Sequence, residues 1–207
     1  MTKYPKYQDY VIKDGQFIGE FEQLYKDFEE PWFQCSQDFD TVRFISLNWM
    51  KNLGVTKVIE LGCGLGPFTN LVSSAGFDVL GVDISPTAIK KARLNHPDCS
   101  FEVGDILDYE IYKEFKPEVV ILAEITWYIL DKLDEFLSFM RKEFPNTFLI
   151  NFLSVYPKDA QKYGRDKFTC LSEIMEYFGM NYLEWGELGA KGKEGKTTYF
   201  LGNWSSD

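Results

Sequence analysis

Histidine is nearly absent from this sequence, and cysteine is sparse. His96 is the single histidine among 207 residues, and the four cysteines (Cys35, Cys63, Cys99 and Cys170) stand far apart, without a CxxC pair. Because zinc sites in proteins are built from closely spaced cysteine and histidine side chains, we expect no metal site. The same cysteine usage predicts reduced thiols and a cytoplasmic location.

Positive charge is also scarce. The chain has 22 lysines and arginines against 32 aspartates and glutamates, a formal net charge of -10. Such a surface repels phosphate backbones and anionic lipids, so we expect neither nucleic acid nor a membrane as a partner. The one basic cluster, Lys191, Lys193 and Lys196, is interpreted as a solvated hairpin loop. No apolar run reaches membrane-spanning length, and the N-terminal residues lack the apolar core of a signal peptide.

From Thr56 onward, apolar strand-like runs alternate with stretches of helical periodicity. The strand-like runs cover residues 57–61, 78–82, 100–103, 118–123 and 147–152, and two more cover 181–187 and 197–204. This alternation predicts a doubly wound, mostly parallel α/β sheet with right-handed crossovers. The last two runs predict an antiparallel hairpin, which completes a seven-stranded sheet. Ser85 is predicted to cap a helix that begins at Pro86, and Asp131 to open a later helix.

The first part of the chain departs from this alternation. Residues 1–19 show no clean period and are predicted to form an arm. Four residues then recur at helical spacing before Pro31: Phe21, Leu24, Tyr25 and Phe28. A second helix is predicted from about Asp40 to Leu53, with Gly54 as its terminator. We therefore expect an N-terminal arm and helical cap over residues 1–54 and the α/β domain over residues 55–207.

A glycine-rich loop follows the first predicted strand of the sheet. Gly62, Gly64 and Gly66 stand between a strand and a helix, where glycine lets the backbone turn tightly and approach a ligand. A dinucleotide fingerprint would need a third glycine where Pro67 stands, so an NAD-type oxidoreductase is disfavoured as the alternative. Glu60, just before the loop, would repel a pyrophosphate but suits a ligand with ammonium and sulfonium charges.

The spacing of Glu60, Gly62, Gly64 and Gly66 resembles the first motif of class I S-adenosylmethionine (SAM)-dependent methyltransferases, which reads E/D-x-G-x-G-x-G. The resemblance extends over residues 57–152, and over the final helix and hairpin by topology. It implies a Rossmann-like fold of the class I type and SAM as the cofactor. The loop residues expected to bind SAM are Glu60, Gly62, Cys63, Gly64 and Gly66.

The loops after the next strands carry the remaining expected SAM contacts. Asp83 ends the second strand, at a spacing suited to a carboxylate that accepts hydrogen bonds from two ribose hydroxyls. Asp105 matches the acidic position that contacts adenine in the family, with Ile106 beside the ring. Ile84 and Ala123 complete the predicted set. Taken singly, Asp83 and Asp105 are also ordinary turn residues.

The fourth loop lies where the family places groups that face the sulfonium and the methyl acceptor. Glu124 follows a fully apolar strand there and is our candidate general base, with Tyr25 as a second candidate. The sequence is equally consistent with Glu124 as a helix cap or as the partner of a lysine. It is also consistent with Trp127 and Tyr128 either lining the pocket or belonging to the core. His96 follows the helix that leaves the ribose loop, so we expect it at the opposite end of the sheet.

The segment from Tyr25 to Trp32 resembles the N-terminal region of NodS-like methyltransferases, which act on amino-sugar oligosaccharides. That resemblance implies a cap that closes over SAM, with Tyr25 and Trp32 walling the acceptor site; the alternative is a helix end that packs Trp32 on the core. The predicted activity is methyl transfer to a hydroxyl or amine of a small molecule, with a sugar or glycan precursor among the candidates. A non-catalytic SAM-binding module is the further alternative, and the acceptor itself stays open.

Overall fold

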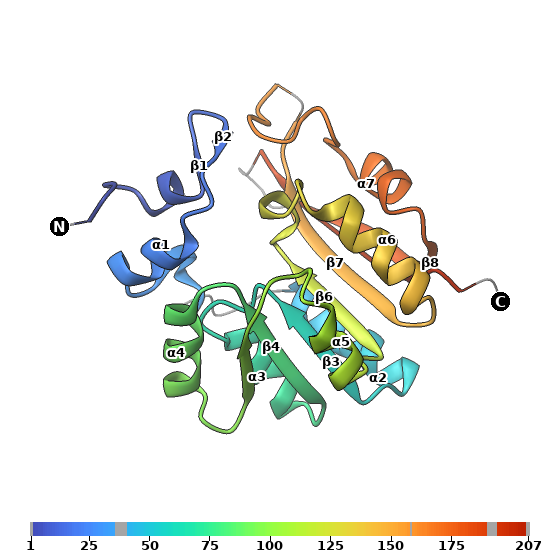
Figure 1. The fold of residues 1–207 in the computed structure, drawn as a ribbon. Helices are drawn as coiled ribbons and strands as arrows, with labels where there is room; N and C mark the ends of the chain where they lie inside the picture. Colours follow the sequence, from blue (N-terminus) through green and yellow to red (C-terminus); the bar gives the residue numbers. More distant parts are fainter. Residues whose placement is uncertain (1, 36–40, 158, 190–193, 206–207) are drawn as a thin grey trace.

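A seven-stranded sheet forms the centre of the computed structural model, which describes residues 2–35, 41–157, 159–189 and 194–205 (Figure 1). Its strand order is β5-β4-β3-β6-β7-β9-β8. The strands are β3 (Lys57–Leu61), β4 (Asp78–Asp83), β5 (Ser100–Val103), β6 (Val119–Ala123), β7 (Phe148–Val155), β8 (Asn181–Gly189) and β9 (Lys196–Asn203). The predicted fold class is confirmed.

The first five strands of the sheet are parallel, and the order reverses at β3, which pairs with β4 on one side and with β6 on the other. Ligands of such sheets bind beyond the carboxyl ends of the strands at this switch point. The predicted C-terminal hairpin is confirmed, because β8 and β9 pair antiparallel. Of the basic cluster at its tip, Lys191 and Lys193 lie outside the described residues, and Lys196 pairs with Glu187 at 2.8 Å.

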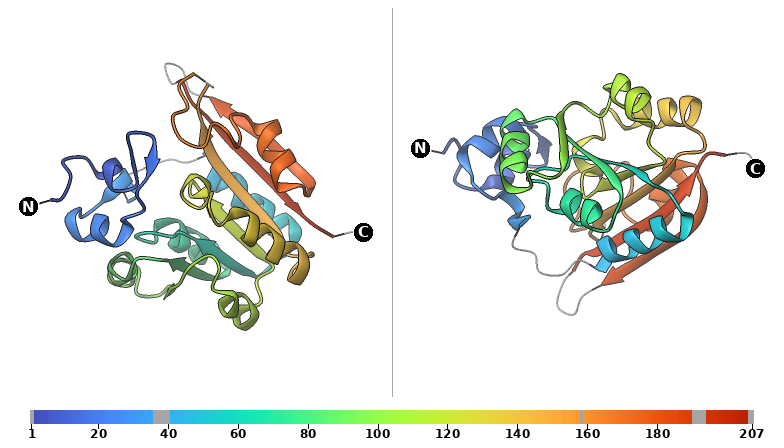
Figure 2. Two further views of the ribbon diagram at one scale, coloured as in Figure 1. Left: turned by 45° about the horizontal axis from the view of Figure 1, so that its top comes forward. Right: turned by 90° about the horizontal axis from the view of Figure 1, so that it is seen from below.

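Helices cover both faces of the sheet (Figures 1 and 2). The helices fall into two groups, one on each face of the sheet. Val119 and Ile121 of β6 pack with the first group, and Val120 and Leu122 pack with the second. Burial on both faces explains why this strand is apolar throughout. The first group is α2 (Thr41–Leu53) and α3 (Pro67–Ser74), and the second is α5 (Tyr109–Phe115), α6 (Leu133–Glu143) and α7 (Leu171–Phe178).

Helix α4 (Pro86–Asn95) begins directly after β4, and its start follows the sequence prediction. Ser85 accepts a hydrogen bond from the backbone N–H of Ala88 at 3.1 Å, and Pro86 occupies the first turn. The prediction for Asp131 was less accurate, because α6 begins two residues later, with Lys132 in the capping position. Helix α5 was not predicted.

Residues 2–35 form a small unit beside α4 rather than a plain arm, visible in blue in Figures 1 and 2. It contains the helix predicted from the spacing of aromatic and apolar residues. Its elements are a 3-10 turn (Tyr7–Tyr10), the two-stranded hairpin β1 (Ile12–Lys13) and β2 (Gln16–Phe17), α1 (Phe21–Asp27) and a second 3-10 turn (Pro31–Phe33). We call residues 2–35 the cap.

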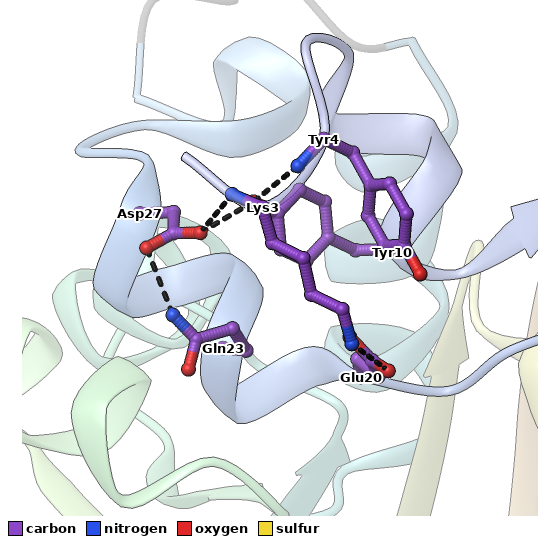
Figure 3. A network of polar contacts seen from close by, with 6 residues as sticks. All are labelled: Lys3, Tyr4, Tyr10, Glu20, Gln23 and Asp27. Atoms are coloured by element: carbon purple, nitrogen blue, oxygen red, sulfur yellow. Dashed lines mark hydrogen bonds and ion pairs between the residues drawn. The ribbon is translucent and has the colours of Figure 1, made fainter. Parts of the chain in front are cut away.

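Polar contacts tie the first residues of the cap to α1 (Figure 3). The carboxylate of Asp27 accepts hydrogen bonds from the Tyr10 hydroxyl, from the backbone N–H of Lys3 at 3.0 Å and from the Gln23 amide at 2.8 Å. The Tyr10 hydroxyl in turn accepts from the backbone N–H of Tyr4 at 3.0 Å. These hydrogen bonds explain how a segment without sequence periodicity still folds.

Helix α2 packs on the sheet rather than on the cap. Val42 and Met50 are buried in one cluster with Val58 of β3 and Ile121 of β6. Asp40, predicted to cap this helix, lies outside the described residues. The predicted division between residues 1–54 and 55–207 stays a prediction, and the burial of α2 on the sheet favours a boundary before it.

Candidate functional site

The glycine loop lies at the carboxyl end of β3 in a conformation that requires glycine. Gly62 has φ +66° and Gly64 has φ +57°, in the left-handed region that side chains disfavour. A Cβ on Gly62 would stand 2.5 Å from the Ile125 side chain, and one on Gly64 would stand 2.5 Å from Gln34 and 2.6 Å from the Tyr25 hydroxyl. The loop therefore needs glycine both for its backbone angles and for the neighbours that approach it.

Asp83 joins the glycine loop to the start of α4. Its side chain is 7% exposed, and its carboxylate accepts hydrogen bonds from the backbone N–H groups of Gly64 and Ser85, each at 2.9 Å. Burial raises the pKa of this carboxyl to about 6, although the two N–H donors favour the charged form. The residue expected to bind ribose thus lies beside the loop expected to bind the rest of the cofactor.

Glu60, at the end of β3, is buried below the surface of the site. It is 3% exposed, and its carboxylate accepts a hydrogen bond from the hydroxyl of Thr69 on α3. Burial raises its pKa to about 7, while the hydrogen bond from Thr69 and the charge of Arg43 act in the opposite direction. Glu60 also interacts electrostatically with Asp83, so two carboxyl groups lie near the glycine loop at this end of the sheet.

Asp105 lies after β5, with its carboxylate held on two sides. One oxygen accepts from the backbone N–H of Leu107 at 3.0 Å, and the other pairs with Lys132. Lys132, at the start of α6, was not singled out in the sequence, since a lone lysine before a helix carries no signal. Ile106 is 9% exposed and part of the core, whereas Ile84 is 49% exposed and open to a ligand.

Glu124 follows β6 and has φ +60°, an uncommon value for a residue with a side chain. Its carboxylate accepts hydrogen bonds from Ser154 of β7, from the backbone N–H at 2.8 Å and from the hydroxyl at 2.9 Å. Its own N–H donates to the carbonyl of Phe152 at 2.9 Å. The carboxylate is thereby fixed at the carboxyl ends of β6 and β7. Ser154 was missed because no motif marks it.

Two cap residues reach the glycine loop. Tyr25 is 2% exposed, and burial together with the charge of Asp83 raises its pKa well above the ordinary tyrosine value. The side-chain oxygen of Gln34 accepts from the backbone N–H of Leu65 at 3.1 Å. Tyr25 thus lies beside the glycine loop, and its predicted roles as a second candidate base and as a wall of the acceptor site stay predictions. Gln34 is an additional contact that the sequence did not indicate.

Aromatic rings connect the cap to the loop after β6. The ring of Trp32 lies 6.1 Å from that of Tyr25 and 6.0 Å from that of Tyr128, and Phe21 lies 5.7 Å from Tyr128. Trp127, by contrast, is 8% exposed, packs against Phe168 in the core with tilted rings and donates to the carbonyl of Ser154 at 2.8 Å. Tyr128 therefore faces the cap, and Trp127 belongs to the core.

His96 lies away from these residues. It follows the last turn of α4, and α4 begins at the carboxyl end of β4, so His96 stands toward the amino ends of the strands. In the described ranges no three His, Cys, Asp or Glu side chains are grouped to hold a metal ion. None of the helices in the described part of the chain combines the length and apolar character needed to cross a membrane.

Part of the chain matches a known protein family. Residues 58–143 match the family described as "Methyltransferase domain". The fold of the whole chain is that of class I methyltransferases. The match contains the glycine loop, Asp83, Asp105 and Glu124, whereas the cap lies outside it.

Curated relatives of this methyltransferase domain differ in their substrates. The chain is 32% identical over 108 residues to the 23S rRNA (uracil(747)-C(5))-methyltransferase RlmC of Actinobacillus succinogenes, covering 47% of this chain and 28% of that protein. It is 30% identical over 93 residues to the ubiquinone biosynthesis O-methyltransferase of Aromatoleum aromaticum, covering 42% and 38%. The chain thus spans less than half the length of these curated relatives.

One solved structure resembles almost the whole chain. The N-methyltransferase NodS from Bradyrhizobium japonicum WM9, in complex with S-adenosylhomocysteine (SAH), aligns with a TM-score of 0.62 and 17% identity. The alignment covers 92% of this chain and 99% of that chain. At this identity the likeness concerns the fold, and it extends beyond the matched domain.

Proposed function

We propose that the protein transfers a methyl group from SAM to a hydroxyl or amine of a small molecule. The observation that carries this proposal is the buried carboxylate of Asp83, which bonds to the N–H of Gly64 across the switch point of the sheet. A carboxylate at that point suits the ribose hydroxyls of SAM. The adjacent glycine loop lets the backbone come close to the amino-acid part of SAM.

The charges around the glycine loop suit SAM better than a dinucleotide. SAM carries an ammonium and a sulfonium, and the carboxyls of Asp83 and Glu60 both interact electrostatically with Cys63 in the loop. Pro67, which begins α3, stands where a dinucleotide site would need its third glycine. Ile84, exposed beside Asp83, and Asp105 complete a surface for the adenine ring. These features support SAM over NAD.

The chemistry is an in-line displacement at the methyl carbon. A lone pair of the acceptor forms the new bond to carbon while the carbon–sulfur bond breaks, and its electron pair stays on sulfur in SAH. Position and exclusion of water supply most of the rate enhancement in such a reaction. The acceptor proton goes to a base, and we assign that role to Glu124, whose carboxylate Ser154 orients.

Tyr25 is less suited to be that base. A tyrosine accepts a proton only as the phenolate, and burial raises the pKa of Tyr25 well above its ordinary value. Its hydroxyl beside Gly64 instead suits a role in closing the cofactor site. Tyr25 and Trp32 would then wall the acceptor side together with Tyr128.

A sugar or glycan precursor is our leading acceptor class. The rings of Trp32 and Phe21 lie against Tyr128, whose hydroxyl is near enough to Glu124 to feel its charge. Such a group of aromatic rings suits a sugar ring, and the NodS likeness supports an amine-bearing one. The net charge of -10 disfavours an RNA substrate like that of RlmC. A cytoplasmic location belongs to the same proposal.

The test begins with calorimetry of the purified chain with SAM, SAH and NAD. Binding of SAM and SAH but not NAD supports the cofactor assignment. Turnover with amino sugars, simple glycosides and catechols, followed by SAH release, then identifies the acceptor class. Tight SAM binding without turnover on any acceptor would favour a non-catalytic SAM-binding module.

A further inference from the structure

Glu22 lies on α1 in the cap, but its carboxylate bonds to the first turn of α4. One oxygen accepts from the Ser85 hydroxyl at 2.6 Å and from the Thr87 backbone N–H at 3.0 Å, and the other accepts from the Thr87 hydroxyl at 2.8 Å. The first turn of a helix has unpaired N–H groups and a partial positive charge, so a carboxylate is favoured there. Burial alone would raise the pKa of Glu22, but the hydrogen bonds from Ser85 and Thr87 lower it to about 2.

Ser85 connects Glu22 to the candidate ribose carboxylate. Its hydroxyl has one proton, which it donates to Glu22, so its lone pairs are left to accept from the N–H of Ala88 at 3.1 Å. Its own backbone N–H donates to Asp83 at 2.9 Å. Ser85 is fully buried, so water does not substitute for either partner. Glu22 therefore sets the orientation of the residue that holds Asp83.

A second contact fastens the C-terminal end of α1 to the middle of α4. The ammonium of Lys91 on α4 donates to the carbonyls of Phe28 at 3.0 Å and Glu29 at 3.3 Å, just past the end of α1. Cations are favoured at the carbonyl end of a helix for the reason that anions are favoured at its start. Helices α1 and α4 lie side by side as a result (Figure 1).

The cap also contacts the glycine loop directly. Gln34 accepts from the N–H of Leu65, and the Tyr25 hydroxyl lies where a side chain on Gly64 would stand. The docked cap therefore touches both loops that the proposed cofactor site uses, one through Ser85 and one through Gln34. A displacement of the cap would therefore break hydrogen bonds to both loops.

We propose that Glu22 is a positioning residue for the cofactor, which acts through Ser85 on Asp83 and couples docking of the cap to SAM binding. The inference rests on the proposed function, because it concerns the same cofactor site. Linkage requires the coupling to be reciprocal: a docked cap raises the affinity for SAM, and bound SAM stabilises the docked cap by the same factor.

Calorimetry with SAH tests the first half of this coupling. Glu22→Gln keeps the shape of the side chain but removes its charge, and it should weaken SAH binding about 5- to 50-fold, within the usual range of coupling between sites. Glu20→Gln is the matched control, because Glu20 pairs with Lys3 inside the cap and makes the same charge change. The control should bind SAH as tightly as the wild type.

A double-mutant cycle with Ser85→Ala separates positioning from a general loss of structure. If Glu22 acts through Ser85, Glu22→Gln should weaken SAH binding much less in the Ser85→Ala background than in the wild type. Additive losses would overturn the relay through Ser85. Thermal unfolding of each variant identifies any that fail to fold, and Ser85→Gly, which also removes the hydroxyl but costs a helix N-cap less than alanine does, then replaces Ser85→Ala.

Hydrogen exchange tests the reciprocal half. SAH should slow amide exchange across α1 in the wild type and much less in Glu22→Gln, with α6 as an internal reference. Wild-type protein that does not bind SAH would refute the proposed function itself. Wild-type protein that binds SAH, with Glu22→Gln binding equally well and α1 exchanging at an unchanged rate, would overturn the coupling alone.

Discussion

The carboxylate of Glu124 is held by Ser154, which donates both its backbone N–H and its hydroxyl to it. Glu124 directly follows one central strand and Ser154 belongs to the neighbouring one, so the pair spans the carboxyl ends of β6 and β7. The left-handed backbone of Glu124 is sustained by this contact and by the bond of its N–H to Phe152. A carboxylate fixed in this way can receive a proton without first reorganising.

Glu124→Gln should separate the two acceptor chemistries. With a hydroxyl acceptor, turnover should fall about 10²- to 10⁴-fold, the usual contribution of a general base, while SAM affinity stays nearly unchanged. With an amine acceptor the loss should be far smaller, because a neutral amine needs no base to attack. Initial rates and SAH calorimetry on the same preparation give both numbers. Full activity on a hydroxyl acceptor would refute the role of Glu124.

Ser154→Ala tests whether the Ser154 hydroxyl assists the Glu124 carboxylate in its role as a base. The variant keeps the backbone N–H donor but loses the hydroxyl donor, so we expect a smaller fall in turnover than in Glu124→Gln, with unchanged SAM affinity. The pH–rate profile is the deciding measurement, because loss of a hydrogen bond to the charged carboxylate should move the acidic limb of the profile, where the base becomes protonated, to higher pH. An unchanged profile would mean that the Ser154 hydroxyl does not tune Glu124.

Gly64→Val should abolish SAM and SAH binding. A Cβ at this position would stand 2.5 Å from Gln34 and 2.6 Å from the Tyr25 hydroxyl, so the valine would displace the cap and enter the space beside the loop. Gly54→Ala is the control, because Gly54 also has a positive φ, +67°, but has nothing within 4 Å of a Cβ. Undiminished SAH binding by Gly64→Val in calorimetry would exclude this loop as the cofactor site.

Asp83→Ala should weaken SAM binding by about 2–3 kcal/mol, or roughly 30- to 150-fold, through loss of charge-assisted hydrogen bonds to ribose. Asp83→Asn should have a smaller effect, because its amide oxygen still accepts. Asparagine offers only one acceptor oxygen to the two N–H donors of Gly64 and Ser85, so some loss is expected even there. Equal SAM dissociation constants for all three proteins would refute the ribose role.

The buried carboxyls predict how the unliganded protein responds to pH. The pKa of Asp83 is raised from 3.8 to about 6 and that of Glu60 from 4.5 to about 7, so the folded state binds these protons more tightly than the unfolded chain. Their contribution to the free energy of unfolding is full below about pH 4 and is lost as pH rises through 6 to 7.

Urea unfolding at pH 5 and pH 8, compared between wild type and Asp83→Asn, measures this contribution. The loss of stability at the higher pH should be smaller in the variant, which has one buried carboxyl fewer. Glu22 does not contribute to the change in stability between pH 5 and pH 8. Its pKa is lowered to about 2, so its contribution to the free energy of unfolding is lost only in stronger acid. An identical pH dependence in both proteins would show that Asp83 does not titrate there.

The sheet could be predicted because its residues repeat a simple alternation. β6 is apolar along its length, the glycine loop follows β3 directly, and Ser85 with Pro86 marks the start of a helix, so each local signal agrees with the global fold. The cap could not be predicted in this way. Its first residues are held by Tyr10 and Asp27, through polar contacts between distant positions that leave no period in the sequence.

The same distinction applies to the site. Gly64 and Asp83 belong to motifs, and their order along the chain predicts their proximity in space. Ser154, Gln34 and Glu22 belong to no motif, and they reach the site only because strands and helices far apart in sequence meet there. Contacts of this kind depend on the three-dimensional arrangement, which single-sequence patterns do not encode.

The most direct test of the central claim is calorimetric titration of the wild-type chain with SAH. At the affinity usual for such cofactors, about −8 kcal/mol, we expect micromolar binding with one SAH per chain, lost in Gly64→Val and absent with NAD. No binding of SAH or SAM by a folded wild-type chain at millimolar ligand, or binding of NAD in their place, would contradict the account.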